Sequence, residues 1–96
     1  MSNIYYLKTS NRKDKKFMVT TPKGKKIHFG AKGMSDYTIH KDYDRMLRYD
    51  SRHKKRENWN DPNTAGFWSK WLLWNLPSLH DSIRKTEREY NIIIRY

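Results

Sequence analysis

The chain contains no cysteine. Disulfides and thiolate metal sites are therefore excluded, and the fold has to be stabilised by packing. Long apolar runs are missing as well, because the longest, Trp71–Trp74, is far shorter than the ~20 residues that cross a bilayer. The first residues, Met1–Tyr6, show no basic segment ahead of an apolar one, so we expect no secretory signal. Together these absences predict a soluble, intracellular protein with no membrane partner.

Apolar residues are also scarce and make up 35% of the chain. The 96 residues allow one domain, residues 1–96. Aromatic residues, by contrast, reach 15%, and each large ring buries roughly 150–250 Å². A few rings can thus supply the burial that aliphatic side chains would otherwise provide. We expect a folded domain with an aromatic core and not a disordered basic peptide.

Acidic residues are outnumbered, with 10 Asp and Glu against 21 Lys and Arg, which gives a net charge of +11. The imbalance is greatest in residues 1–33, where nine basic residues accompany one acidic residue. Concentrated positive charge attracts anionic partners, of which nucleic acid is the commonest.

Patterning predicts the order of strands and helices. β-branched and aromatic runs between turn residues predict strands, and spaced apolar residues behind the capping residues Asp61 and Ser78 predict helices. The expected strands are 4–7, 17–20, 26–29 and 92–94, and the expected helices run from about 40 to 57, 62 to 75 and 78 to 90. The chain thus divides into a Lys-rich β meander (1–33), a helical part (38–90) and a terminal strand (91–96). This order predicts an α+β fold, in which a small antiparallel sheet of meander plus terminal strand packs against about three helices.

The basic residues form two groups. The first, the hairpin lysines, surrounds the two turns of the meander: Lys13, Lys15, Lys16, Lys23, Lys25 and Lys26. The second, the helix cations, recurs every three or four residues on the first predicted helix and continues into its basic end: Arg45, Arg48, Arg52, Lys54, Lys55 and Arg56. We interpret both groups as phosphate contacts, because Lys and Arg clustered on one face are the footprint of a nucleic-acid-binding protein.

Each group also has a simpler explanation. Lysines on strands discourage edge-to-edge aggregation, and Asp42, Asp44 and Asp50 can balance a solvated helix face. That balance does not extend to residues 52–56, which have only Asp50 and Glu57 nearby and also resemble a nuclear localisation signal. Neither group indicates base-specific readout, which favours paired Arg, Asn or Gln on a rigid element.

The remaining ring-bearing residues do not indicate catalysis. Helical spacing places Trp68 and Trp71 in the core, and Trp59 is the tryptophan expected to be exposed. The histidines are scattered, and no pair has the i, i+4 spacing of a helical zinc site: His28, His40, His53 and His80. No Walker A loop or dinucleotide-binding fingerprint is present. We therefore expect no metal, no cofactor and no enzymatic activity.

Four segments carry a family resemblance: Ile27–Gly30, Asp36–Asp42, Arg52–Trp59 and Thr64–Asn75. The last, with its closely spaced tryptophans, is the most distinctive. With these segments the chain resembles a family of small basic proteins encoded by large nucleocytoplasmic DNA viruses (giant viruses). The resemblance implies a place in the virion near the packaged genome, or in the host nucleus or a cytoplasmic viral factory. It carries over no catalytic residues.

These observations predict a non-enzymatic, largely sequence-independent DNA-binding or chromatin-associated protein involved in viral genome compaction or packaging. Its expected partners are double-stranded DNA or nucleosome-like particles. The alternative is an adaptor or virion structural protein that binds an acidic protein surface such as a histone acidic patch. In that case an Arg of the 52–56 run would form bidentate pairs with carboxylates.

Overall fold

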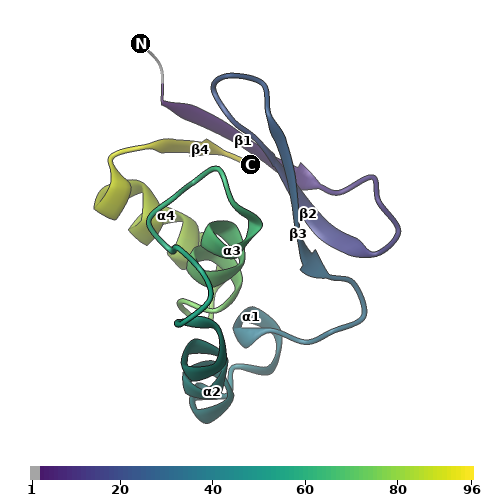
Figure 1. The fold of residues 1–96 in the computed structure, drawn as a ribbon, viewed down its shortest axis with the longest axis vertical. Coiled ribbons are helices and arrows are strands. Elements are labelled where there is room, and N and C mark those ends of the chain that lie inside the picture. Colours follow the sequence, from purple (N-terminus) through teal and green to yellow (C-terminus); the bar gives the residue numbers. More distant parts are fainter. Residues whose placement is uncertain (1–2) are drawn as a thin grey trace.

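A computed structural model of the chain describes residues 3–96, so Met1 and Ser2 of the predicted meander lie outside the described residues. The fold is α+β, as predicted, with a four-stranded sheet in the order β3-β2-β1-β4 (Figure 1). The strands are β1 (Ile4–Thr9), β2 (Lys15–Thr20), β3 (Lys26–Ala31) and β4 (Ile93–Arg95). β1, β2 and β3 form the expected antiparallel meander.

The terminal strand gives the sheet its mixed character. β4 pairs parallel to β1, with Ile93 opposite Ile4 and Arg95 opposite Tyr6. A parallel neighbour cannot follow from a tight turn and needs a crossover connection, which the helical segment supplies here. The chain therefore leaves the sheet at β3, one edge, and returns at the other edge beside β1.

The helices are α1 (Tyr37–His40), α2 (Tyr43–His53), α3 (Ala65–Trp68), the π-helix η1 (Ser69–Leu73) and α4 (Leu79–Tyr90). The first predicted helix, 40–57, is shorter and is preceded by a separate turn of helix. Lys41 adopts a left-handed conformation (φ 56°) that ends α1. The Asp42 carboxylate then accepts from the backbone N–H of Arg45 and begins α2.

The second predicted helix begins later than expected. Thr64, and not Asp61, caps α3 by accepting from the N–H of Phe67 at 3.3 Å. The Asp61 carboxylate instead accepts from the N–H of Asn63 at 3.0 Å and shapes the preceding turn. The third helix is as predicted, since the Ser78 hydroxyl caps it and left-handed Asn91 (φ 53°) ends it.

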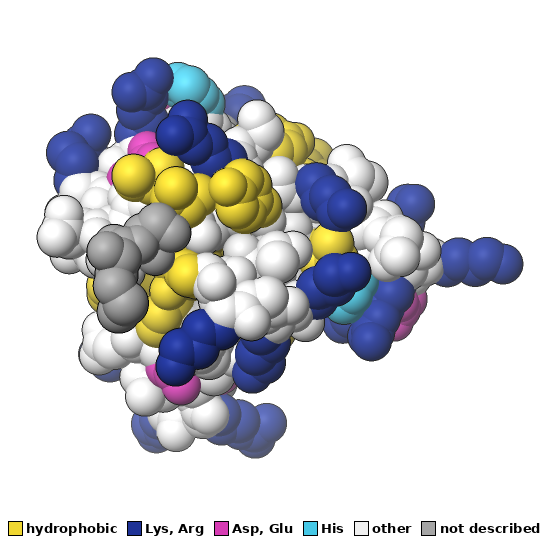
Figure 2. All heavy atoms as spheres, turned by 90° about the horizontal axis from the view of Figure 1, so that it is seen from above, with side chains coloured by type: hydrophobic (Ala, Val, Ile, Leu, Met, Phe, Trp, Pro, Cys, Tyr) yellow, Lys and Arg dark blue, Asp and Glu magenta, His cyan; other side chains and the backbone are white. Residues whose placement is uncertain are grey.

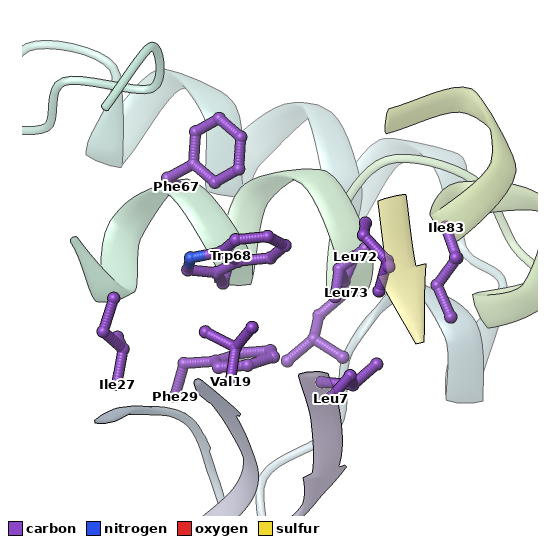
Figure 3. Packing of buried hydrophobic residues seen from close by; sticks show 10 residues of the cluster. Leu7, Val19, Ile27, Phe29, Phe67, Trp68, Leu72, Leu73 and Ile83 are labelled. Atoms are coloured by element: carbon purple, nitrogen blue, oxygen red, sulfur yellow. The ribbon is translucent and has the colours of Figure 1, made fainter. Parts of the chain in front are cut away.

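Trp68 lies at the centre of the core. Its side chain is fully buried, and its indole N–H donates to the Pro62 carbonyl at 2.8 Å. Figure 3 shows the ring between the helix that carries it and the strand residues Val19 and Phe29. Because the neighbouring strand residues Leu7 and Ile27 belong to the same cluster, one face of the sheet is sealed by the α3–η1–α4 layer. This confirms that Trp68 is a core residue.

Trp59 is partly buried, contrary to expectation. Its indole N–H donates to Glu57 at 2.9 Å, and its carbonyl accepts from the Trp71 indole at 2.6 Å. Between the rings of Trp59 and Trp71 lies the Lys70 ammonium, 5.2 and 5.4 Å from the two ring centroids. The loop before α3 is thus packed onto η1 by contacts that the local sequence pattern does not reveal.

Gly24 and Gly30 both have a positive φ angle but differ in how closely other atoms surround them. Substituting each one therefore distinguishes the cost of backbone strain from the cost of overpacking. A Cβ on Gly30 (φ 77°) would lie 2.8 Å from Leu73 Cδ1, whereas one on Gly24 (φ 89°) would meet nothing within 4 Å. Gly24→Ala should cost about 1–2 kcal/mol for the left-handed conformation. Gly30→Ala should cost about 2–5 kcal/mol, because Leu73 is buried and overpacking adds to that strain. Urea unfolding measures both losses, and equal losses would show that Leu73 does not restrict Gly30.

Candidate nucleic-acid interface

The hairpin lysines do not form one cluster. Lys13, Lys15 and Lys16 lie at the β1–β2 end of the sheet, and the other three lie at the β2–β3 turn. Successive turns of a meander fall at opposite ends of the shared strand, so the six residues of β2 separate them by about 17 Å. Two of the six are already engaged: Lys16 pairs with the buried Asp36, and Lys25 donates to the Asn63 carbonyl at 3.0 Å.

The helix cations are all exposed. Arg45, Arg48 and Arg52 lie on α2, whereas residues 54–56 follow its end in a turn. Within residues 3–96 none of the six forms an ion pair. Of the three acids expected to balance them, Asp42 caps α2, Asp44 lies exposed in its first turn, and Asp50 pairs with the inward-pointing Lys70 at 2.8 Å. The solvated face of α2 therefore carries more positive than negative charge.

A cavity of about 370 Å³ joins the two basic groups. It opens where the β2–β3 hairpin faces α2 and η1, and Phe29, Leu73 and Trp74 line it. Lys15 from β2 and Arg52 from α2 also line it, although 37 positions separate them in the sequence. The fold therefore brings two hairpin lysines, Lys15 and the paired Lys16, and one helix cation, Arg52, to a single concave surface.

The carboxylates of this cavity are already satisfied. Asp36 accepts from the Lys16 ammonium and from the N–H of Thr38. Glu57 lies 3.3 Å from His53 Nδ1 and accepts from the Trp59 indole. Lys15 and Arg52 have no carboxylate partner among the described residues. An anion entering the cavity would thus meet cations that are free to bind it.

An aromatic stack forms one wall of the cavity. Tyr49 lies between His53, at 4.1 Å between ring centroids, and Trp74, at 4.3 Å and nearly parallel. Burial raises the pKa of Tyr49 well above its ordinary value, and the nearby Glu57 and Asp50 carboxylates raise it further. The stack fixes the end of α2 against η1 and so fixes the position from which Arg52 reaches the cavity.

The outer face of the sheet carries two basic residues that the sequence interpretation missed, Lys8 and Arg95, besides Lys26, which it had named. Side chains alternate along a strand, so Tyr6 and Lys8 point away from the core that contains Leu7. Both are exposed, as are Lys26 and Arg95 on the flanking strands. Seen from above, Lys and Arg project around much of the outline, and Asp and Glu appear only in small patches (Figure 2). The alternation of side chains within residues 4–9 could have predicted that Tyr6 and Lys8 face outward. The pairing of β4 with β1, which places Arg95 beside Tyr6, has no signal in the sequence.

The four segments that carry the family resemblance meet at the cavity. They contribute Gly30, Asp36, Arg52 and Trp74, among others, to its lining. In residues 3–96 no three His, Asp or Glu side chains cluster as metal ligands would. Over the same residues no helix has the length and apolar character needed to cross a bilayer.

The fold and this surface define a small α+β domain with a strongly basic, concave surface. The chain belongs to DUF5754, a family of unknown function, which it matches over residues 5–53. The matched segment includes both lysine turns and all of α2. Searches of curated proteins and of solved structures gave no match.

The buried Tyr49 phenol predicts alkaline instability. Its pKa in the folded state is raised above the unfolded value near 10. The stabilisation is therefore fully present below pH 10. Above pH 10 the phenol ionises in the unfolded chain but not in the folded one, so the free energy of unfolding falls. In the Tyr49→Phe variant the free energy of unfolding should fall less steeply above pH 10, by about 1.4 kcal/mol per pH unit. Urea unfolding between pH 8 and about 12 measures the slope. Tyr43→Phe, at a phenol that is 59% exposed, is the control, and an equal change there would contradict the assignment.

Proposed function

We propose that the protein binds double-stranded DNA through its phosphate backbone, largely independently of sequence. One observation carries the proposal: Lys15 and Arg52, from two basic segments far apart in the sequence, line one cavity without a carboxylate partner. Cations that are free and preorganised can replace the counterions of a polyanion without first breaking ion pairs.

The surface around the cavity supports contact with an extended strand. The exposed Arg12 and Lys13 of the β1–β2 turn continue from Lys15, and the exposed run 54–56 continues from Arg52. A cavity of about 370 Å³ holds only a small part of an extended strand, so these flanking cations would follow the backbone on either side. α2 carries no Asn or Gln, the residues that pair with adenine. Its arginines can bind phosphate oxygens in bidentate pairs.

The resemblance to giant-virus proteins supports a setting in which this binding compacts or packages a viral genome. A large DNA virus has to neutralise a long polyanion, and a folded domain of charge +11 contributes to that neutralisation. Such a role requires neither catalysis nor a cofactor.

A second candidate partner is an acidic protein surface such as that of a nucleosome-like particle. The exposed, unpaired Arg45, Arg48 and Arg52 favour it, because guanidinium groups bind carboxylates in bidentate pairs. Competition separates the two candidates: excess free DNA displaces the protein from such a particle only if the contacts are shared.

Removing the two cavity cations should weaken duplex binding. Lys15→Ala combined with Arg52→Ala is expected to lower affinity by similar factors for two unrelated duplex sequences. The slope of log affinity against log salt should become shallower by about 1.8, since each lost phosphate contact removes about 0.9. Fluorescence anisotropy of labelled duplexes across a salt series measures both quantities.

The matched control is Arg84→Ala combined with Arg88→Ala, which removes two exposed cations from α4. These residues do not line the cavity, so the slope should stay close to that of the unaltered protein. An unchanged slope in the Lys15/Arg52 variant, or an equal change in the α4 variant, would refute the cavity as the phosphate site.

A further inference from the structure

The outer face of the sheet is a second exposed surface with a distinct chemistry. Cα pairing places Arg95, Tyr6, Thr20 and Lys26 in one row across all four strands. Neighbouring strands are about 5 Å apart, so the tyrosine has a cation on the adjacent strand and another about 10 Å away on its other side. Lys8 follows Tyr6 on the same face, two residues along β1.

The strand residues of this face supply an aromatic ring and cations. Tyr6 is 54% exposed, and the four strands contain neither Asp nor Glu. Met18 lies between Lys8 and His28 and is buried, yet it does not belong to the core cluster. The pKa of His28 is lowered first by desolvation and then by the nearby Arg12; Asp14 opposes this, and Lys26 and Lys15 lower it further. The strand residues of this face carry a net positive charge, because Lys8, Lys26 and Arg95 have no Asp or Glu beside them on the strands.

We propose that the outer sheet face binds unpaired nucleotides of a single-stranded nucleic acid, with Tyr6 stacking on a base and Lys8, Lys26 and Arg95 contacting phosphates. This site goes beyond the proposed duplex binding, which uses the cavity beside α2. Base stacking requires an unpaired base with a free π face, and a ring on an open sheet flanked by cations offers the matching surface.

The charges also argue against a second copy of the chain as the occupant. In a two-fold dimer the same patch meets itself, so Lys8, Lys26 and Arg95 would lie opposite the same three cations. Like charges that face each other across a protein interface are destabilising. A polyanion, in contrast, neutralises all three.

The test compares Tyr6→Ala, Tyr6→Phe and Tyr43→Ala in binding to labelled oligo(dT) and oligo(U) of about ten nucleotides and to a duplex. Tyr6→Ala should weaken single-strand binding by about 5- to 150-fold and leave duplex binding unchanged. Tyr6→Phe, which keeps the ring, should bind as the unaltered protein does. Tyr43→Ala is the matched control, because Tyr43 is equally exposed (59%) but lies on α2. The tighter of the two single strands identifies the sugar that the site prefers.

Equal single-strand affinity of Tyr6→Ala and the unaltered protein would overturn the proposal, as would an equal loss in Tyr43→Ala. Light scattering adds a second readout, since a dimer that Tyr6→Ala dissociates would make this face a self-association surface. Photocrosslinking of a bromouracil-containing strand should label the β1 peptide, and labelling of α2 alone would also overturn the site. Failure of duplex binding in the Lys15/Arg52 experiment is a separate outcome, because that experiment leaves the outer face intact.

Discussion

A buried lysine holds the helical layer in one arrangement. The Lys70 side chain is only 9% exposed, and its ammonium donates to both oxygens of Asp50 and to the Trp74 carbonyl. A buried charge without its partner is strongly destabilising, so α2 has to lie where Asp50 reaches η1. The rings of Trp59 and Trp71 also lie close to the ammonium, with their centroids 5.2 and 5.4 Å away. The position of Arg52 at the cavity depends on this pairing, since Asp50 and Arg52 share one helix turn.

The scarcity of aliphatic residues explains why the sheet is covered on one side only. The α3–η1 segment supplies Phe67, Trp68, Leu72 and Leu73 to the cluster, and this single dense layer seals one face of the sheet. With 35% apolar residues the chain has little left to build a second layer. The opposite face consequently remains open to solvent, and α2 lies beyond the sheet at the end of the long axis away from the N-terminus (Figure 1). The exposure of both the outer sheet face and α2 thus follows from the low fraction of apolar residues.

Local signals predicted the parts of the fold that local interactions determine. The meander and α4 could be predicted because turn residues and the capping residues Ser78 and Asn91 act within a few positions. The break at Lys41, the π-helical turn and the parallel pairing of β4 depend on contacts between distant segments, and no local pattern reveals them. The same limit applies to the site. The individual cations could be named from the sequence, but the meeting of Lys15 and Arg52 depends on the Lys70–Asp50 pair, whose members are 20 positions apart.

The charge distribution links stability to binding. Residues 3–96 contain three ion pairs, and two of them use lysines that are largely withdrawn from solvent. The exposed cations are therefore mostly uncompensated, and their mutual repulsion opposes the compact state of a chain with charge +11. Spreading them over α2 and the outer sheet face keeps the two groups apart and reduces that repulsion. A polyanion on either surface reduces it further, and any ligand that binds only the folded state stabilises that state in proportion to its concentration and affinity. The excess charge thus makes the free domain less stable while favouring the bound one.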